Sequence, residues 1–329
     1  MSYRVLLTGA GVASEARESL LKHGCVIEQG DPEDTVPALV RRLHGFDPHG
    51  IIVRQGRITR EVQEAAPSLR VICKHGVGVD NIDIEAATER GIPVLFTPDA
   101  NYETAAEHTL ALMLSLVRRI PAEDRRIRSG IFDKRGYGGR GLHGTVLGLI
   151  GFGRIGRRVA ELVEPFGMRV LVYHPTATDE SLPWHIAKVT SVEEVLSEAD
   201  VVSLHCPLTA ETRGLISTRT LGLMKEGAFL VNTSRGGVVE EADLVAAIRA
   251  GRIAGAALDV FQEEPLPADH PLLELDAVVV TTHVAGVSDV SFRQMGLEAA
   301  GHVLTVLDGR PPDRRALLNP EAPAREGRG

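Results

Sequence analysis

The sequence has few cysteines, few aromatic residues and no excess of positive charge. Its 329 residues include 3 cysteines, which are widely spaced at Cys25, Cys73 and Cys206. An odd number of scattered cysteines argues against a disulfide framework or a zinc knuckle, so we expect a reducing compartment and no metal. The formal net charge of −8 gives no basic footprint for nucleic acid or for an anionic membrane.

Long apolar runs are also missing. No uncharged apolar run is long enough to span a bilayer, and the start of the chain moves directly into a strand-like run without the apolar core of a signal peptide. Hydrophobic residues make up 43% of the chain, which is enough for sizeable cores and for two domains. We therefore expect a cytoplasmic globular enzyme.

Strands and helices alternate along the first part of the chain. Strands are predicted at 5–8, 26–28, 51–54, 71–74 and 94–96, and helices at 14–22, 34–43, 59–65 and 83–90. Such alternation predicts a parallel sheet with helices on both faces. The first α/β unit takes roughly residues 1–98.

A second α/β pattern follows a long apolar helix predicted at 104–119. Pro121 is expected to end that helix, and a charged helix at 122–129 comes next. Strands are predicted at 146–150, 169–173, 201–204, 228–232, 255–258 and 278–282, which indicates a doubly wound sheet whose ligands bind beyond the carboxyl ends of the strands. A last helix at 291–307 is expected to return to the first domain, and residues from Pro311 onward to form a tail.

The glycines of this second pattern lie where a strand turns into a helix. Gly151, Gly153 and Gly156 have the spacing in which the first permits a tight turn, the second admits a pyrophosphate and the third lets the helix pack closely. The alternative is an ordinary glycine-rich turn. Because both the buried strand and the amphipathic helix flank it, we predict a dinucleotide site with phosphates at the helix start.

The position that normally reads the ribose is unusual. An Asp or Glu is expected at the end of the second strand, and His174 stands there instead. The missing carboxylate would tolerate a 2′-phosphate, yet no Arg or Lys follows to attract one. His174, Thr176 and Thr178 can hydrogen-bond either ribose, so NAD is favoured and NADP stays open.

Three strand ends each carry one chemically useful side chain: Arg235, Glu264 and His283. Reducing a ketone needs a hydride donor, a proton donor and a cation for the substrate's charge. Histidine donates protons near neutral pH, a carboxylate orients it, and arginine forks onto a carboxylate. Each residue alone would fit a turn, a solvated loop or a core, but their joint placement predicts a dehydrogenase site.

A set of motifs is shared with one known family and covers nearly the whole chain. The motifs are Lys74–Asp83, Ala106–Leu110, the Gly151 turn, Asn232–Gly237, Ala257–Val260 with Glu264–Pro265, and His283–Gly286. By these motifs the chain resembles the D-isomer-specific 2-hydroxyacid dehydrogenase family. The resemblance implies two doubly wound parallel-sheet domains: a Rossmann NAD(P)-binding domain, 99–286, inserted into a flavodoxin-like substrate domain, 1–98 and 287–329. It also implies a homodimer formed largely through the nucleotide domains.

The resemblance further implies a role for each site residue. Arg235 would bind the substrate carboxylate and carbonyl oxygen, and His283 would be the acid/base, paired with Glu264. Arg54 and the backbone N–H groups of Val77 and Gly78 would also hold the substrate. The residues expected to contact the cofactor are Gly151, Gly153, Arg154, Ile155, Gly156, His174, Cys206, Thr233, Ser234, Asp259 and Gly286, with Asp259 at the nicotinamide amide.

Finer similarities among the motifs suggest a substrate. The motifs are most similar to those of D-3-phosphoglycerate dehydrogenases, in which an arginine at the place of Arg54 lies near the substrate and the segment of Lys134 and Arg135 is also basic. A hydroxypyruvate or glyoxylate reductase is the alternative. Val77 stands where these relatives often have Thr. No regulatory domain is expected after Leu307. A binding protein of the corepressor type, which uses the same fold, remains the alternative of another class.

Overall fold

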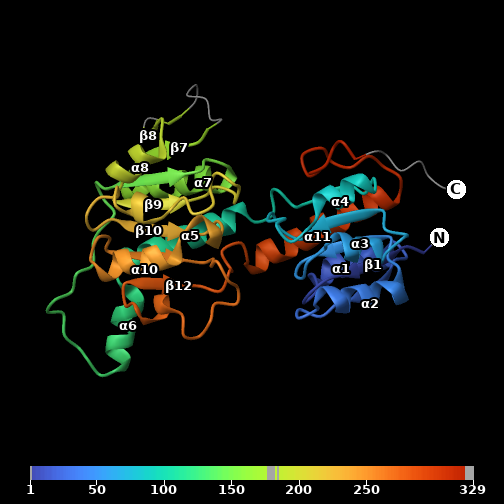
Figure 1. Ribbon diagram of the computed structural model, residues 1–329, viewed down its shortest axis with the longest axis horizontal. Coiled ribbons are helices and arrows are strands. Elements are labelled where there is room, and N and C mark those ends of the chain that lie inside the picture. Colours follow the sequence, from blue (N-terminus) through green and yellow to red (C-terminus); the bar gives the residue numbers. More distant parts are fainter. Residues whose placement is uncertain (1, 176–181, 184, 323–329) are drawn as a thin grey trace. The chain divides into compact units, whose positions relative to one another are not determined.

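The computed structural model describes residues 2–175, 182–183 and 185–322. The chain divides into two compact units (Figure 1): unit 1 is Met1–Asn101 with Val287–Gly329, and unit 2 is Tyr102–Gly286. The sequence-based boundaries fell after residues 98 and 286. Both units contain a fully parallel sheet between helices, so the predicted α/β class is confirmed. Within the described residues, no helix has the length and apolar character needed to cross a membrane.

Unit 1 is a sheet of order β2-β1-β3-β4-β5. Its strands are β1 Arg4–Leu7, β2 Val26–Gln29, β3 Gly50–Val53, β4 Val71–Lys74 and β5 Val94–Leu95, and its helices are α1 Ser14–Lys22, α2 Val36–Phe46, α3 Arg60–Glu64, α4 Ile84–Glu89 and α11 Asp289–Leu307. Helices α1 and α11 bury apolar side chains against one face, and α2, α3 and α4 cover the other. Because α11 follows unit 2 in the chain, both chain halves build unit 1.

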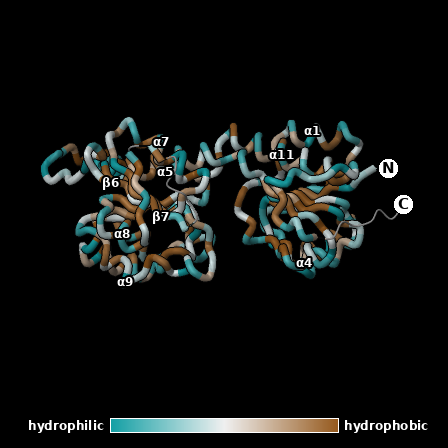
Figure 2. The backbone as a smooth tube through the Cα atoms, turned by 90° about the horizontal axis from the view of Figure 1, so that it is seen from above, coloured by the Kyte–Doolittle hydropathy of each residue, from teal (hydrophilic) through white to brown (hydrophobic). Residues whose placement is uncertain are grey.

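Unit 2 is a sheet of order β12-β11-β10-β9-β6-β7-β8. Its strands are β6 Val146–Ile150, β7 Arg169–Tyr173, β8 Ile186–Lys188, β9 Val201–Leu204, β10 Phe229–Asn232, β11 Gly255–Leu258 and β12 Val278–Val280, and its main helices are α5 Tyr102–Val117, α6 Ile120–Arg128, α7 Arg154–Val163, α8 Val192–Glu198, α9 Thr218–Leu221 and α10 Glu241–Arg249. Helices α5 and α7 pack on one face, and α8 and α10 on the other. Figure 2 shows the apolar strands inside each unit.

The strand order of unit 2 reverses at β6, which lies between β9 and β7. Strand order reverses at such a point in doubly wound sheets, and their ligands bind there, beyond the carboxyl edge. The Gly151 turn follows β6 directly, so it lies at this reversal. The short strand β8 and the helix α9 were not predicted, because neither is long enough to show a period.

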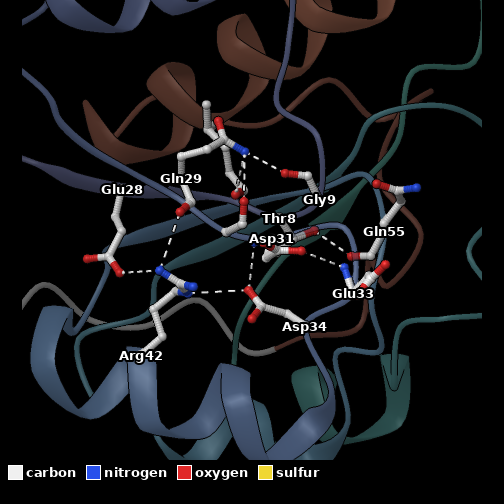
Figure 3. A network of polar contacts seen from close by, with 11 residues as sticks. Thr8, Gly9, Glu28, Gln29, Asp31, Glu33, Asp34, Arg42 and Gln55 are labelled. Atoms are coloured by element: carbon white, nitrogen blue, oxygen red, sulfur yellow. Dashed lines mark hydrogen bonds and ion pairs between the residues drawn. The ribbon is translucent and has the colours of Figure 1, made fainter.

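Helix α2 begins at Val36 and not at Asp34, as the sequence had suggested. The Asp34 carboxylate instead accepts the backbone N–H of Asp31 at 2.8 Å and pairs with Arg42 at 3.3 Å (Figure 3). Thr35 is the N-cap, and Pro37 lies in the first turn, where its missing N–H costs no hydrogen bond. The acidic residues before α2 therefore tie down the loop that leads into it.

Pro121 begins a helix and does not end one. Helix α5 ends at Val117, Arg119 has left-handed backbone with φ 55°, and Pro121 lies in the first turn of α6. A proline is tolerated there because the first N–H groups of a helix have no partner in the helix. The break between α5 and α6 is made by Arg118 and Arg119.

The segment after Pro311 is not a tail over its first part. Asn319 is 1% exposed, its Oδ1 accepts the N–H of Val94 at 2.8 Å, and its Nδ2 donates to the carbonyl of Ile92 at 2.9 Å. Leu317 forms an antiparallel bridge with Leu95. Strand β5 is the edge of its sheet, and the segment around Asn319 supplies partners for its outer backbone groups. The Pro- and Arg-rich composition hid this packing.

Candidate active site

The glycine turn of unit 2 is built by close backbone approach. Gly151 has φ 103°, and a Cβ placed on it would lie 2.5 Å from the carbonyl group of His205. A Cβ on Gly156 would lie 2.5 Å from the carbonyl oxygen of Gly151. Only glycine fits at either position, because a side chain would push the turn away from β9 or the helix away from the turn.

Gly153 differs from the other two glycines. A Cβ placed on Gly153 meets no atom within 4 Å. The packing of the protein itself therefore does not require a glycine at this position. Gly153 is the N-cap of α7, and no side chain caps that helix. No side chain at the N-cap therefore accepts from the first N–H groups of α7, and the space beside Gly153 is open. A phosphate fits both observations, because helix N-termini bind anions through such groups. Arg154 and Ile155 form the first positions of α7.

His174 and Cys206 follow the strands on either side of β6. His174 follows directly after β7, whose last residue Tyr173 lies beside Ile150 in register. The structure therefore places His174 at the carboxyl edge, next to the glycine turn. Thr176 and Thr178 lie outside the described residues. Cys206 follows β9, and burial raises the pKa of its thiol to about 11, so it is a neutral thiol at the carboxyl edge of the sheet.

The loop after β10 presents Arg235 on a fixed backbone. The buried side chain of Asn232 accepts the N–H and the hydroxyl of Ser234 through Oδ1, at 3.0 and 2.8 Å, and donates to the carbonyl of Arg235 at 2.9 Å. The Arg235 guanidinium donates to the carbonyl of Ser234 at 2.7 Å. Gly236 follows, where any Cβ would overlap the carbonyl of Phe261. The loops after β10 and β11 are therefore in direct backbone contact.

Glu264 and His283 form a hydrogen-bonded pair. Glu264 Oε2 lies 2.7 Å from His283 Nδ1, and Glu264 Oε1 accepts the N–H of Phe261 at 3.0 Å. Burial alone would raise the pKa of Glu264, but the hydrogen bonds from His283 and Phe261 outweigh it and the pKa is lowered. Glu264 therefore stays ionised at neutral pH, where its carboxylate can accept a hydrogen bond from the ring of His283. The His283 side chain is 50% exposed, so its ring is open to a ligand.

Asp259 is the buried centre of these loops. It is 0% exposed and follows β11, and its carboxylate accepts the N–H groups of Val284 at 2.9 Å and Ala285 at 2.8 Å and the hydroxyl of Thr281 at 2.6 Å. Its carbonyl accepts the N–H of His283 at 2.8 Å. The sequence suggested a cofactor contact for Asp259 but not its hydrogen bonds to the loop that carries His283. The role of Thr281 was not predicted, because nothing in its spacing indicates it.

Unit 1 carries the other suggested substrate residues. Arg54 follows β3, its guanidinium donates to the carbonyl of Gly11 at 3.2 Å, and it stacks on the ring of Phe292 at 4.8 Å. Burial lowers the Arg54 pKa. Val77 is 39% exposed in the loop after β4, and Gly78 follows it.

In the basic segment between α6 and β6, Arg135 is already paired with a carboxylate. Arg135 is turned to Asp133, at 2.9 Å, on an exposed loop of unit 2, so its charge is already matched. No group of His, Cys, Asp and Glu suited to a metal ion occurs within 2–175, 182–183 and 185–322.

The open space at Gly153 can be tested separately from the fold. Gly153→Ala should leave the melting temperature unchanged and weaken NADH binding about tenfold or more, because the methyl group occupies the approach to the helix N-terminus. Gly156→Ala should lower both the melting temperature and the affinity, since its Cβ meets backbone. Fluorescence titration with NADH and thermal unfolding measure the two quantities. Unchanged affinity in Gly153→Ala would show that no phosphate binds there.

Comparison with known proteins identifies the family of this architecture. The family model described as D-isomer specific 2-hydroxyacid dehydrogenase, NAD binding domain, matches residues 110–285. A D-3-phosphoglycerate dehydrogenase of Archaeoglobus fulgidus is 38% identical over 93% of this chain and 58% of its own length. A glyoxylate reductase of Thermofilum pendens is 39% identical over 92% of this chain and 91% of its own length. The chain thus spans only 58% and 50% of the first two curated relatives, both phosphoglycerate dehydrogenases.

Solved structures agree with this result over nearly the whole chain. The TT0316 protein of Thermus thermophilus has a TM-score of 0.87 at 39% identity, covering 96% of this chain and 99% of its own. A D-lactate dehydrogenase of Aquifex aeolicus, solved with NAD and lactic acid, has a TM-score of 0.83 at 30% identity, covering 96% and 99%. The chain therefore belongs to the D-isomer specific 2-hydroxyacid dehydrogenase family, and unit 2 contains the family's NAD-binding domain.

Proposed function

We propose that this protein is an NAD-dependent oxidoreductase that interconverts a 2-oxo acid and a D-2-hydroxy acid. The observation that carries the proposal is the Glu264–His283 pair, 2.7 Å apart, held beside the Arg235 loop at the carboxyl edge of the sheet that also carries the Gly151 turn. Bound nicotinamide supplies or accepts the hydride. The side chains of unit 2 supply the proton, the positive charge and the cofactor cradle.

His283 acts as the acid in reduction and as the base in oxidation. Its Nδ1 is committed to Glu264, so Nε2 is the atom that exchanges a proton with the substrate oxygen. Ionised Glu264 fixes the ring and stabilises its protonated form. The half-exposed ring is accessible to substrate while the loop that carries it is anchored at Asp259.

Arg235 supplies the positive charge that a 2-oxo acid requires. Its guanidinium carries several N–H donors in a planar fork, which matches the carboxylate and the adjacent carbonyl oxygen of such a substrate. In unit 1, the backbone N–H groups of Val77 and Gly78 are proposed to donate to a substrate carboxylate. The loop geometry set by Asn232 holds the backbone of the arginine in place, and one of its guanidinium N–H groups donates to the carbonyl of Ser234.

The proposed first substrate is the D-3-phosphoglycerate/phosphohydroxypyruvate pair, and Arg54 supports it. Its half-buried guanidinium forms no ion pair among the described residues, so its only charge partner would be an anionic ligand. Glyoxylate or hydroxypyruvate is the second candidate, because relatives named glyoxylate reductase match along 91% and 80% of their own lengths. NAD is proposed over NADP, since the chain next to His174 offers no cation for a 2′-phosphate.

Oxidation of NADH and of NADPH, followed optically with phosphohydroxypyruvate, hydroxypyruvate, glyoxylate and pyruvate, tests the reaction, the substrate and the cofactor together. Turnover with NADH and phosphohydroxypyruvate is the expected result. A strong preference for NADPH would overturn the cofactor proposal, and a preference for glyoxylate would select the second substrate. Silence across the panel would overturn the enzymatic function in favour of a dinucleotide-sensing binding protein.

His283→Ala should lower turnover by roughly two to four orders of magnitude, the usual share of acid–base catalysis. NADH affinity should stay unchanged, because the Gly151 turn is untouched. Steady-state kinetics and an NADH titration measure the two effects. Near-normal turnover in the variant would remove His283 from the reaction.

Glu264→Gln should move the pH profile of reduction toward lower pH. The neutral amide no longer stabilises the imidazolium, so the proton needed for reduction is lost at a lower pH. Glu263→Gln, an exposed neighbour, is the matched control and should leave the profile in place. An unmoved profile in Glu264→Gln would argue that the carboxylate does not support the acid.

We further propose a homodimer formed through unit 2. Exposed apolar side chains on α6 and the loop after it support this: Ile127 is 53% exposed, Ile131 48% and Phe132 94%. Phe132→Asp should shift the sedimentation of the protein from dimer toward monomer, whereas Leu21→Asp on α1, also at an exposed apolar position, should not. A wild-type protein that sediments as a monomer would contradict the proposal.

A further inference from the structure

Helix α5 contacts the two loops that carry the proposed catalytic side chains. Its segment Ala106–Leu110 is one of the family motifs, yet none of its residues has a role in the proposed reaction. His108 Nε2 lies 3.1 Å from the hydroxyl of Thr281, in the loop after β12. The next residue, Thr109, is 2.8 Å from the hydroxyl of Thr233, in the loop after β10. Adjacent residues of one helix therefore reach the loops of His283 and Arg235.

The direction of the hydrogen bonds at His108 is fixed by the groups around it. Thr281 has one hydroxyl proton, which goes to the Asp259 carboxylate at 2.6 Å. Its oxygen can therefore only accept from His108, so His108 carries a proton on Nε2. The result is a chain of donors from His108 through Thr281 to Asp259.

The chain of donors ends on the groups that hold the acid/base. Asp259 binds the backbone of Val284 and Ala285 on one side of His283 and the hydroxyl of Thr281 on the other. His283 itself has left-handed backbone with φ 55°, which is uncommon for residues other than glycine. The loop geometry that aims the imidazole therefore depends on Asp259 keeping all these bonds.

His108 also lies close to the carboxylate of Asp259. The carboxylate is 0% exposed, and a buried charge is costly unless it is paired. The Nε2 of His108 lies 3.6 Å from Oδ1 of this carboxylate. The His108 side chain is 24% exposed, whereas that of Asp259 is 1% exposed.

The direction of the second hydrogen bond of α5 is also fixed by a neighbouring group. The Thr109 hydroxyl donates to the carbonyl of Ala105 at 2.7 Å, so it accepts from Thr233. Thr233 lies next to Ser234, whose carbonyl anchors the Arg235 guanidinium. Two adjacent residues of α5 thus position the loop of His283 and the loop of Arg235.

We propose that His108 is a positioning residue for the acid/base: through Thr281 and Asp259 it fixes the backbone that aims the His283 imidazole. The inference rests on the proposed function, because it assigns His108 a share in the same reaction. It differs from a packing role, since the proposal requires the Nε2–H donor and not merely the volume of the ring.

His108→Leu should lower turnover about ten- to a hundredfold, because small misplacement of a catalytic group has costs of that size. The NADH dissociation constant should change little, since the Gly151 turn is not involved. His108→Gln keeps a donor near the Nε2 position and should recover most of the loss. Thr281→Val should reproduce the loss by removing only the hydroxyl, and Thr281→Ser should restore it.

A second comparison separates positioning from folding. In a His283→Ala background, His108→Leu should cause no further loss of turnover, because the residue that it positions is gone. His44→Leu, at an exposed position of α2, is the matched control and should change neither turnover nor melting temperature.

The inference is overturned if His108→Leu keeps at least half of the wild-type turnover, if His108→Gln is as slow as His108→Leu, or if His108→Leu causes the same loss with and without His283. Should His108→Leu fail to fold, the Thr281→Val and Thr281→Ser pair decides by the same criteria. Silence of the unmodified protein with every 2-oxo acid would instead overturn the proposed function, and the inference with it.

Discussion

The candidate site depends on one buried carboxylate. Asp259 receives two backbone N–H groups and a hydroxyl from the loop that carries His283, and its own N–H donates to the carbonyl of Asn232 at the end of β10. A carboxylate with several hydrogen bonds at 0% exposure is rigid, because losing any bond would leave a charge unsatisfied in a place that water cannot reach. The exposed pair of Glu264 and His283 is therefore mounted on a support that is more firmly held than the pair itself.

The architecture and the main side chains could be predicted from the sequence because parallel sheets follow simple rules. Strand ends in such a sheet meet at one edge, so Arg235, Glu264 and His283 had to be neighbours once their strands were recognised. The glycine spacing was informative because a Cβ on Gly151 or on Gly156 would lie 2.5 Å from backbone, so that only glycine fits. These are strong local constraints, and they leave a clear trace in the sequence.

The rest depended on contacts between residues far apart in the chain, which leave no such trace. The hydroxyl of Thr281 and the ring of His108 are separated by 173 positions, and nothing in either segment indicates the other. The same is true of Asn319, which completes strand β5 from 225 residues away inside a segment that reads as a tail. Asp34 and Pro121 were misplaced by local rules that each allow two outcomes: a short acid can cap a helix or tie a loop, and a proline can follow a helix or begin one.

The interleaved order of the two units has a consequence for how the chain is made. Unit 1 begins at the amino terminus, but one face of its sheet is covered by α11, which is translated after all of unit 2. Ala299, Ala300 and Val303 of that helix are fully buried against strands made long before it. On the ribosome, the nucleotide-binding unit can fold as a complete body while the first sheet still exposes an apolar face. The strands that are translated first thus belong to the unit that is completed last. Until α11 is made, the uncovered apolar face of their sheet is the surface that a chaperone would have to protect.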